Sequence, residues 1–233
     1  MPIFDPTYIL LVLIPGMIIS GGASLLVRSA FNRYSKVASR RGISGAQAAQ
    51  ILLDNAGIHD VSIVRTSGYL SDHYNPQTKE LALSEPVYAS NSLAAVGVAC
   101  HEAGHAIQHA KGYAPLGLRS ALVPLAGIGS SLGYMVMLAG LIFLQSQTLV
   151  AIGALLFSAT LLFQIVTLPV EFDASARAKR LVVEAGIVSS DERYGIDRVL
   201  NAAALTYVAA VISTLLTMIW FLLRSGLLGG SRE

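Results

Sequence analysis

The sequence predicts a mainly α-helical integral membrane protein, with four transmembrane helices and an α+β insert between the first two. Of its 233 residues, 54% are hydrophobic and only 13% are charged. An average soluble domain is about 25% charged. The mean hydropathy is +0.61. In addition, the charged residues leave uncharged runs that are each long enough for a membrane-spanning helix of about 20 residues.

The spans are placed from the gaps between charges. One uncharged run separates Asp5 from Arg28, and a run long enough for two spans separates Arg119 from Glu171. The polar residues 145–148 divide that longer run, and so short a connection predicts a helical hairpin. The first span is expected to be retained, since a signal peptide would carry its basic residues before the apolar run. The predicted spans are residues 7–27, 120–144, 149–169 and 203–223.

Positive charge is concentrated in two segments between the spans. Residues 28–119 hold nine of the sixteen lysines and arginines, and residues 170–202 hold five. Loops rich in these residues are typically cytoplasmic. We therefore expect both segments on the cytoplasmic side of a bacterial inner (plasma) membrane, where their residues can meet. The single cysteine, Cys100, cannot form an intramolecular disulfide, which suits that side, and we interpret it as a core residue.

The most informative motif is His-Glu-Ala-Gly-His at residues 101–105. The surrounding segment, about 90–110, is predicted to be a helix with Ser90 or Asn91 as N-cap and a stop at 111–112. Its residues are mostly small and apolar, which indicates a buried helix. Buried histidines and a buried glutamate are costly without a partner, and a metal ion would be one.

The spacing of this motif predicts a zinc site. Residues four apart on a helix face the same way, so the imidazoles of His101 and His105 can hold one Zn²⁺ at about 2.0–2.1 Å. Glu102, beside the first ligand, is the predicted catalytic base that takes a proton from a zinc-activated water. Gly104 leaves room for the backbone of a partner or substrate. The alternative is a helix with two hydrogen-bonded histidines and a surface glutamate.

A catalytic zinc usually has a third protein ligand. His109 is two turns beyond His101, about 12 Å along the axis, so both cannot bind one ion from an unbroken helix. Glu171 is the preferred ligand, in a segment expected to open a new helix with Pro169 near its start. The alternative for Glu171 is a membrane-border carboxylate that the dipole at a helix N-terminus favours.

The insert before the motif helix mixes helix and strand signals. Residues 43–57 predict a short amphipathic helix, capped by Ser44 and ended by Gly57. Residues 61–66 and 79–84 predict a hairpin or a strand pair. Such strands can bind an extended substrate along a sheet edge, or can only support the motif helix. Between them, His73 or Tyr74 could donate a hydrogen bond to an oxyanion, or could belong to an ordinary turn.

These segments resemble the YugP-like family of bacterial membrane zinc metallopeptidases. The resemblance covers nearly the whole chain and rests on GYLSDHYNP (68–76), on residues 83–110 and on LPVEFDASARAKR (168–180). It implies a zincin-like insert in which His101, His105 and Glu171 bind one zinc ion, a gluzincin-like set, with Glu102 as base.

More distantly, the chain resembles the HtpX-type and CAAX prenyl-protease families. These families place an aspartate four residues after the third ligand, where this chain has Ser175. A serine can hydrogen-bond to a ligand histidine but brings no charge. Asp173 is expected to face elsewhere. The residues expected to support the ligands or the transition state are His73, Tyr74, His109 and Ser175.

The sequence thus favours a zinc-dependent endopeptidase that cleaves membrane-associated proteins or peptides at the cytoplasmic surface of the lipid bilayer. The alternative is a non-catalytic zinc-binding membrane scaffold or chaperone-like quality-control partner. Closed structural zinc sites favour four ligands, often cysteines, and this chain has one cysteine. A transporter is disfavoured because the spans hold only neutral polar residues such as Gln164. With a net charge of +2 and no glycine-rich phosphate loop, a nucleic-acid partner is not expected.

Overall fold

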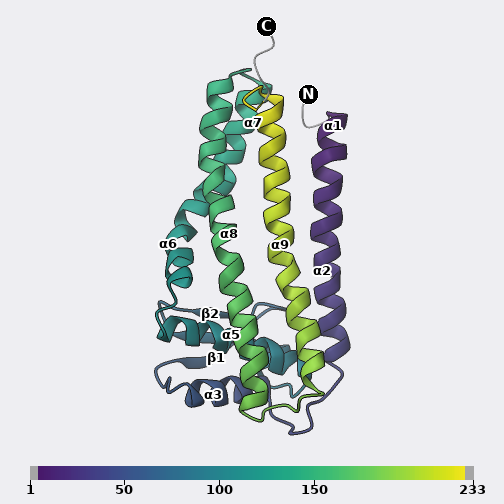
Figure 1. The fold of residues 1–233 in the computed structure, drawn as a ribbon, viewed down its shortest axis with the longest axis vertical. Coiled ribbons are helices and arrows are strands. Elements are labelled where there is room, and N and C mark those ends of the chain that lie inside the picture. The colour runs from purple at the N-terminus through teal and green to yellow at the C-terminus, as the bar shows by residue number, and fades with distance from the viewer. Residues whose placement is uncertain (1–4, 229–233) are drawn as a thin grey trace. The chain divides into compact units, whose positions relative to one another are not determined.

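The structure is a computed structural model that describes residues 5–228 of the chain. It is mainly helical and divides into two compact units (Figure 1). The first, here called the helical unit, comprises Met1–Ala23, Leu118–Leu168 and Thr206–Glu233. The second, the mixed unit, comprises Ser24–Gly117 and Pro169–Leu205 and contains every strand of the described residues.

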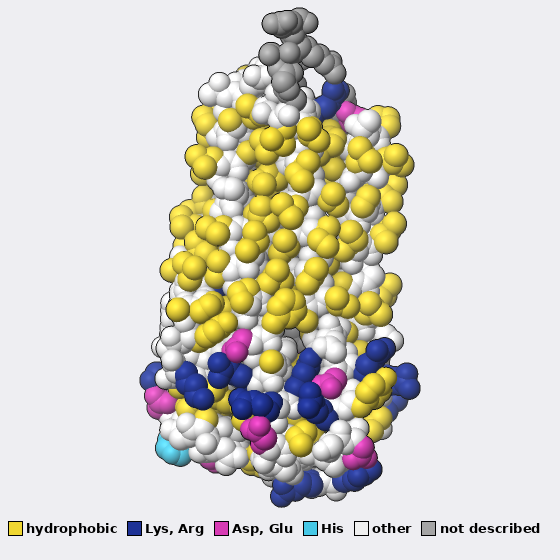
Figure 2. Space-filling view, in the orientation of Figure 1, with side chains coloured by type: hydrophobic (Ala, Val, Ile, Leu, Met, Phe, Trp, Pro, Cys, Tyr) yellow, Lys and Arg dark blue, Asp and Glu magenta, His cyan; other side chains and the backbone are white. Residues whose placement is uncertain are grey.

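Four helical runs are long and apolar enough to cross a membrane, as the sequence predicted. Hydrophobic side chains cover the face of the long helices that Figure 2 shows. Two of the runs include a short π-helical segment. The first consists of α1 (Pro6–Tyr8), η2 (Ile9–Leu13) and α2 (Ile14–Tyr34), and the second of α6 (Ala114–Ile128), η3 (Gly129–Gly133) and α7 (Tyr134–Ile142). The others are α8 (Gln147–Glu184) and α9 (Arg193–Arg224).

Within the helical unit, glycines allow two neighbouring helical runs to pack closely. A Cβ added to Gly133 would lie 2.6 Å from the backbone nitrogen of Phe157. One added to Gly153 would lie 2.5 Å from the backbone nitrogen of Met137. Contacts this close require glycine, because a methyl group would overlap the opposite backbone. The hairpin expected across residues 145–148 therefore forms, with its two arms in backbone contact.

The expected helix start near Pro169 is wrong. Helix α8 continues without a break from Gln147 through Pro169 to Glu184. Proline removes one backbone donor, but apolar helices tolerate it where neighbouring groups satisfy the freed carbonyl. Glu171 therefore lies in the interior of a long helix, and the helix-dipole alternative for this residue does not apply.

The first helix of the mixed unit follows the prediction closely. Helix α3 spans Gly45–Asn55, and the Ser44 side chain accepts a hydrogen bond from the backbone of Gln47. The Gln47 side chain reciprocates at the Ser44 backbone, which completes a capping box. Gly57 has a φ of +70° just beyond the helix, a conformation that glycine adopts without strain.

The sheet of the mixed unit has the order β1-β3-β2. Strand β1 (Ser62–Thr66) is parallel to β3 (Glu80–Ser84), and β2 (His73–Asn75) is antiparallel to β3. The two predicted strands therefore do pair, but the predicted hairpin is wrong. A parallel pair needs a crossover connection. Residues 67–79 supply it and contribute the short strand β2 on the way.

Helix α5 (Leu93–Ala110), which carries the motif, is the buried centre of the mixed unit. It follows α4 (Glu85–Tyr88) and packs against α3 (Figure 1). The N-cap is Ser92, whose side chain accepts from the backbone of Ala95 at 3.2 Å, and not Ser90 or Asn91. Ser90 instead donates a hydrogen bond to Ser92. The predicted stop is confirmed, since Gly112 has a φ of +62° after the last turn.

Candidate metal site

Helix α5 presents two histidines on one face. The ring centroids of His101 and His105 lie 4.7 Å apart. The four-residue spacing on a helix produces this arrangement. His105 is buried, with 6% of its surface exposed, and His101 is half-buried. The same helix face thus directs two imidazoles toward one point in the interior of the mixed unit.

Helix α8 brings a carboxylate to the same point. Glu171 is 2% exposed, and its Oε2 lies 3.2 Å from His101 Nε2 and 3.6 Å from His105 Nε2. One candidate ligand atom from each of the three residues lies within 4.8 Å of the others. Two imidazoles and one carboxylate are a donor set that catalytic zinc sites use. The three residues therefore fit a zinc ion, with a further coordination position left for water or substrate.

Gly104 allows α5 and α8 to approach this closely. A Cβ at this position would lie 2.7 Å from the carbonyl oxygen of Ala174 and 3.2 Å from its Cα. Both neighbouring atoms belong to the backbone, which cannot give way as a flexible side chain can. The sequence indicated that Gly104 admits another backbone, but the expectation of a partner or substrate there is wrong. The backbone that occupies the space is that of α8 in the same chain.

The second nitrogen of each histidine also has a partner. His101 Nδ1 lies 3.1 Å from Ser175 Oγ, and His105 Nδ1 lies 3.0 Å from Gln108 Oε1. Such contacts hold a ligand imidazole in its ring orientation. The structure therefore brings Ser175 to the ligand cluster, as the sequence led us to expect.

Gln108 and Asp173 are polar residues of the site that the sequence analysis missed. Gln108 is fully buried, and its Nε2 donates at 2.8 Å both to the Val170 carbonyl oxygen and to Asp173 Oδ2. Asp173 also pairs with Arg177 one turn along α8. As expected, Asp173 contacts neither histidine directly, but the sequence did not predict its hydrogen bond to Gln108. The available signal was a glutamine on a helix expected to be buried, about one turn after His105.

Glu102 is buried on α5, with 8% of its surface exposed. Burial alone would lower the pKa of His105, but contact with Glu171 and the charge of Glu102 raise it above its ordinary value. The two carboxylates therefore act on the same imidazole. Their combined negative charge favours a cation at this point, which again fits a metal ion.

Two of the three remaining candidates, Tyr74 and His109, contact each other and are not part of the cluster. Tyr74 on β2 is half-buried, and its hydroxyl lies 2.8 Å from Nδ1 of His109 on α5. Burial and the Asp60 carboxylate raise the Tyr74 pKa, so the phenol stays protonated. His109 is not part of the three-residue cluster. His73 is exposed, and its Nδ1 contacts the Ser71 carbonyl oxygen at 2.9 Å, as a turn residue would.

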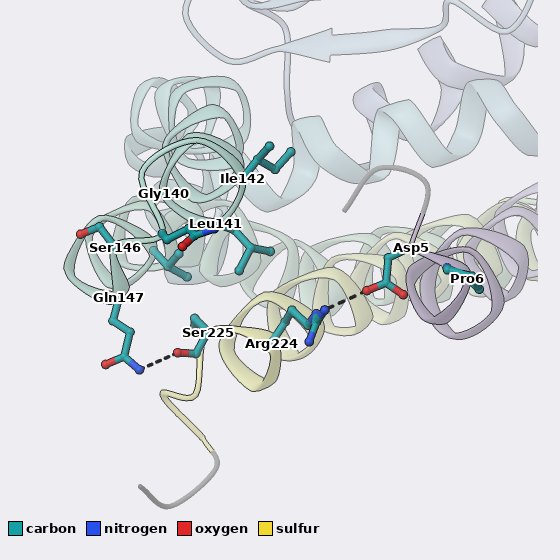
Figure 3. Close-up of a pocket in the computed structure, with 11 residues that line it drawn as sticks. Asp5, Pro6, Gly140, Leu141, Ile142, Ser146, Gln147, Arg224 and Ser225 are labelled. Atoms are coloured by element: carbon teal, nitrogen blue, oxygen red, sulfur yellow. Dashed lines mark hydrogen bonds and ion pairs between the residues drawn. The ribbon is translucent and has the colours of Figure 1, made fainter. Parts of the chain in front are cut away.

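A separate pocket of about 870 Å³ lies in the helical unit and is lined by none of these site residues (Figure 3). Two contacts join residues that line the pocket. Arg224 forms an ion pair with Asp5, at 3.3 Å, and Gln147 donates a hydrogen bond to the Ser225 carbonyl oxygen. These contacts join the ends of helices. We interpret the pocket as the space between those ends.

The proteins to which this chain is similar are described as zinc peptidases or membrane proteases, which agrees with a metal site. A family model described as "Putative neutral zinc metallopeptidase" matches residues 8–226. The chain is 43% identical over 201 residues to a protein of Bacillus subtilis (strain 168) named "Putative membrane protease YugP". That match covers 86% of this chain and 89% of the Bacillus protein. No solved structure matches the chain.

Proposed function

Because the chain belongs to the neutral zinc metallopeptidase family whose model it matches, we propose that it is a membrane-embedded zinc endopeptidase. His101, His105 and Glu171 hold one zinc ion, and Glu102 is the general base. The observation that carries this proposal is the buried cluster of three ligand atoms from α5 and α8, all within 4.8 Å. A buried cluster of this kind is costly unless a cation compensates its charges.

Each residue of the site has a separate role in the proposed peptide hydrolysis. A zinc ion held by His101, His105 and Glu171 would supply a Lewis acid that polarises the scissile carbonyl and acidifies a bound water. Glu102 takes the proton from the water and later delivers it to the leaving amine. Ser175 and Gln108 hold the two ligand imidazoles in orientation. The Tyr74 hydroxyl, which contacts His109, is the proposed hydrogen-bond donor to a bound substrate.

The sheet offers a binding edge for an extended peptide. Strand β2 is an edge strand, and it contacts α5. A substrate segment can add to such an edge through backbone hydrogen bonds, which demand little of its sequence. This geometry supports a protein or peptide substrate. The apolar helices support a membrane-associated one, and the positive charge of residues 28–119 and 170–202 supports a site on the cytoplasmic side of the inner membrane.

Replacing Glu102 by glutamine tests the proposal. The amide keeps the shape of the side chain but cannot accept a proton at neutral pH. Loss of a general base typically lowers turnover about 10²–10⁴-fold. We expect Glu102→Gln to retain zinc and to lose hydrolysis of a casein-like substrate by that factor, with metal content and proteolysis measured on the full chain in detergent.

Glu85→Gln is the matched control, because Glu85 is exposed on α4 of the same unit and lies outside the cluster. It should hydrolyse like the wild type. A Glu102→Gln protein with wild-type turnover would exclude this residue as the base. A wild type that binds zinc but cleaves nothing would instead favour the non-catalytic scaffold or chaperone-like partner.

A further inference from the structure

We propose that Gln108 and Asp173 form a positioning pair that fixes the orientation and the tautomer of the His105 ring. The pair keeps a proton on Nδ1 and leaves the Nε2 lone pair free for a metal ion. This inference rests on the proposed function, because it assigns these residues to the same zinc site. It deepens that proposal by adding Asp173 and by stating which ring nitrogen of His105 the Gln108 contact leaves free for the metal.

The hydrogen bonds of Gln108 admit one orientation of its amide. The amide has two N–H donors on one atom and an acceptor oxygen on the other. One end of it contacts the Val170 carbonyl oxygen and Asp173 Oδ2, both at 2.8 Å. Both of these atoms can only accept. A flipped amide would place three oxygens together in a buried position, so the nitrogen must face them.

The orientation of the Gln108 amide then determines which ring nitrogen of His105 carries a proton. Because the Gln108 nitrogen donates to Val170 and Asp173, the Gln108 Oε1 faces His105 Nδ1, at 3.0 Å. An oxygen that only accepts requires a proton on that nitrogen. In the neutral ring, Nε2 then keeps its lone pair, and Nε2 is the atom that lies 3.6 Å from Glu171 Oε2. The nitrogen nearest the cluster is therefore the one prepared to bind a metal.

The negatively charged carboxylate of Asp173 holds the Gln108 amide in this orientation. Its Oδ2 accepts from Gln108 and also from Arg177, which holds the carboxylate in place from the next turn of α8. At the other ligand, Ser175 contacts His101 Nδ1 at 3.1 Å, and a hydroxyl can donate or accept. Ser175 thus orients His101 without dictating its proton. The Asp173 carboxylate therefore acts on His105, through its hydrogen bond with Gln108.

Zinc affinity tests the pair directly. Gln108→Met keeps the length of the side chain and removes its hydrogen bonds. Removal of a group that orients a metal ligand typically costs about 10–100-fold in metal affinity. We expect that loss in competition titrations with a chelating dye on the full chain in detergent. Gln50→Met is the control, since Gln50 is an exposed glutamine on α3, and it should bind zinc like the wild type.

A second variant separates positioning from a purely structural role. In Gln108→Glu/Asp173→Asn, the new carboxylate still accepts from His105 Nδ1, and the new amide donates to the carboxylate. The pair keeps its single negative charge, but a carboxylate oxygen replaces the nitrogen that donates to the Val170 carbonyl, and Arg177 loses its carboxylate partner at position 173. If the pair positions His105, this double variant binds zinc more nearly like the wild type than like Gln108→Met.

Two results would overturn the inference. One is wild-type zinc affinity in Gln108→Met. The other is a double variant as weak as Gln108→Met, which would mean that the contacts to Val170 and Arg177, and not the support of His105, explain the effect of Gln108. A wild-type protein without zinc affinity would contradict the proposed function itself. Tight wild-type binding with an unaffected Gln108→Met would contradict only the positioning pair.

Discussion

At the scale of single residues, the candidate site depends on a few buried polar side chains that compensate one another. Glu171 is 2% exposed and contacts both motif histidines. His109 lies on the same helix as those histidines but contacts Tyr74 instead. Substitutions of Glu171 and of His109 should therefore have opposite effects on zinc binding.

Glu171→Ala should abolish stoichiometric zinc binding, because it removes one of the three proposed ligands. His109→Ala should retain one zinc ion per chain, since helix rise carries His109 about 12 Å from His101 along the axis. Metal analysis of the two purified variants compares them directly. Normal zinc in Glu171→Ala together with loss in His109→Ala would reverse the ligand assignment.

At the scale of elements, the site forms where α5 crosses α8, and its geometry depends on how closely the two backbones approach. Gly104 is the point of closest approach, beside the backbone of Ala174. A second junction ties residues near Arg40 to the connection between α8 and α9. There Glu192 accepts from the Arg40 backbone at 2.7 Å and from the Ser189 backbone at 2.9 Å.

Gly104→Ala should weaken both stability and zinc binding. A methyl group 2.7 Å from a backbone oxygen forces α8 away from α5 and moves Glu171 from the histidines. Overpacking of this kind typically costs about 1–3 kcal/mol. Thermal unfolding with and without zinc measures both effects. Gly117→Ala, on α6 with no atom within 4 Å of the new methyl group, is the control and should not destabilise.

The Glu192 junction should make stability depend on pH. Burial raises the pKa of Glu192, but hydrogen bonds from Ser189 and the Arg40 backbone outweigh burial and hold it below its ordinary value of 4.5. A carboxyl with a lowered folded-state pKa stabilises the protein above its unfolded pKa, and that contribution is lost as pH falls through the folded value.

Glu192→Gln should therefore lower the unfolding temperature near neutral pH, and the difference from the wild type should shrink as pH drops below about 4.5, the range in which the unfolded carboxyl takes up its proton. Unfolding curves over a pH series measure this. A difference that stayed constant with pH would exclude a role for the Glu192 charge.

At the scale of the whole molecule, four apolar helical runs indicate a multi-pass membrane protein. The lysines and arginines are concentrated in residues 28–119 and 170–202, whereas residues 145–148 carry no charge. Segments rich in these cations usually stay on the cytoplasmic side. The two clusters and the uncharged turn should therefore lie on opposite sides of the membrane.

Cysteine labelling measures this topology. Single cysteines at the exposed positions Ser67 and Thr148 would be introduced in a background in which Cys100 is alanine. A membrane-impermeant thiol reagent on intact cells should label position 148 and spare position 67. The Cys100→Ala background alone should remain unlabelled. Labelling at position 67 would place the motif helix outside and remove the case for cytoplasmic substrates.

The sequence by itself determined what depends on neighbouring residues. The spacing of His101 and His105 directs both rings to one side of a helix, and uncharged runs predict the four long helices. The cap at Ser44 and the stop at Gly112 are local hydrogen-bond and φ effects, and both were predicted correctly.

Only the tertiary structure decided the features that join distant parts of the chain. Glu171 contacts His101 across 70 residues, from the interior of a helix that the sequence analysis expected to begin near Pro169. The parallel pairing of β1 with β3 and the bond from Gln108 to Asp173 likewise depend on how separate elements pack. Spacing along one helix cannot predict these contacts, because close packing between helices, such as that at Gly104, sets which side chains meet.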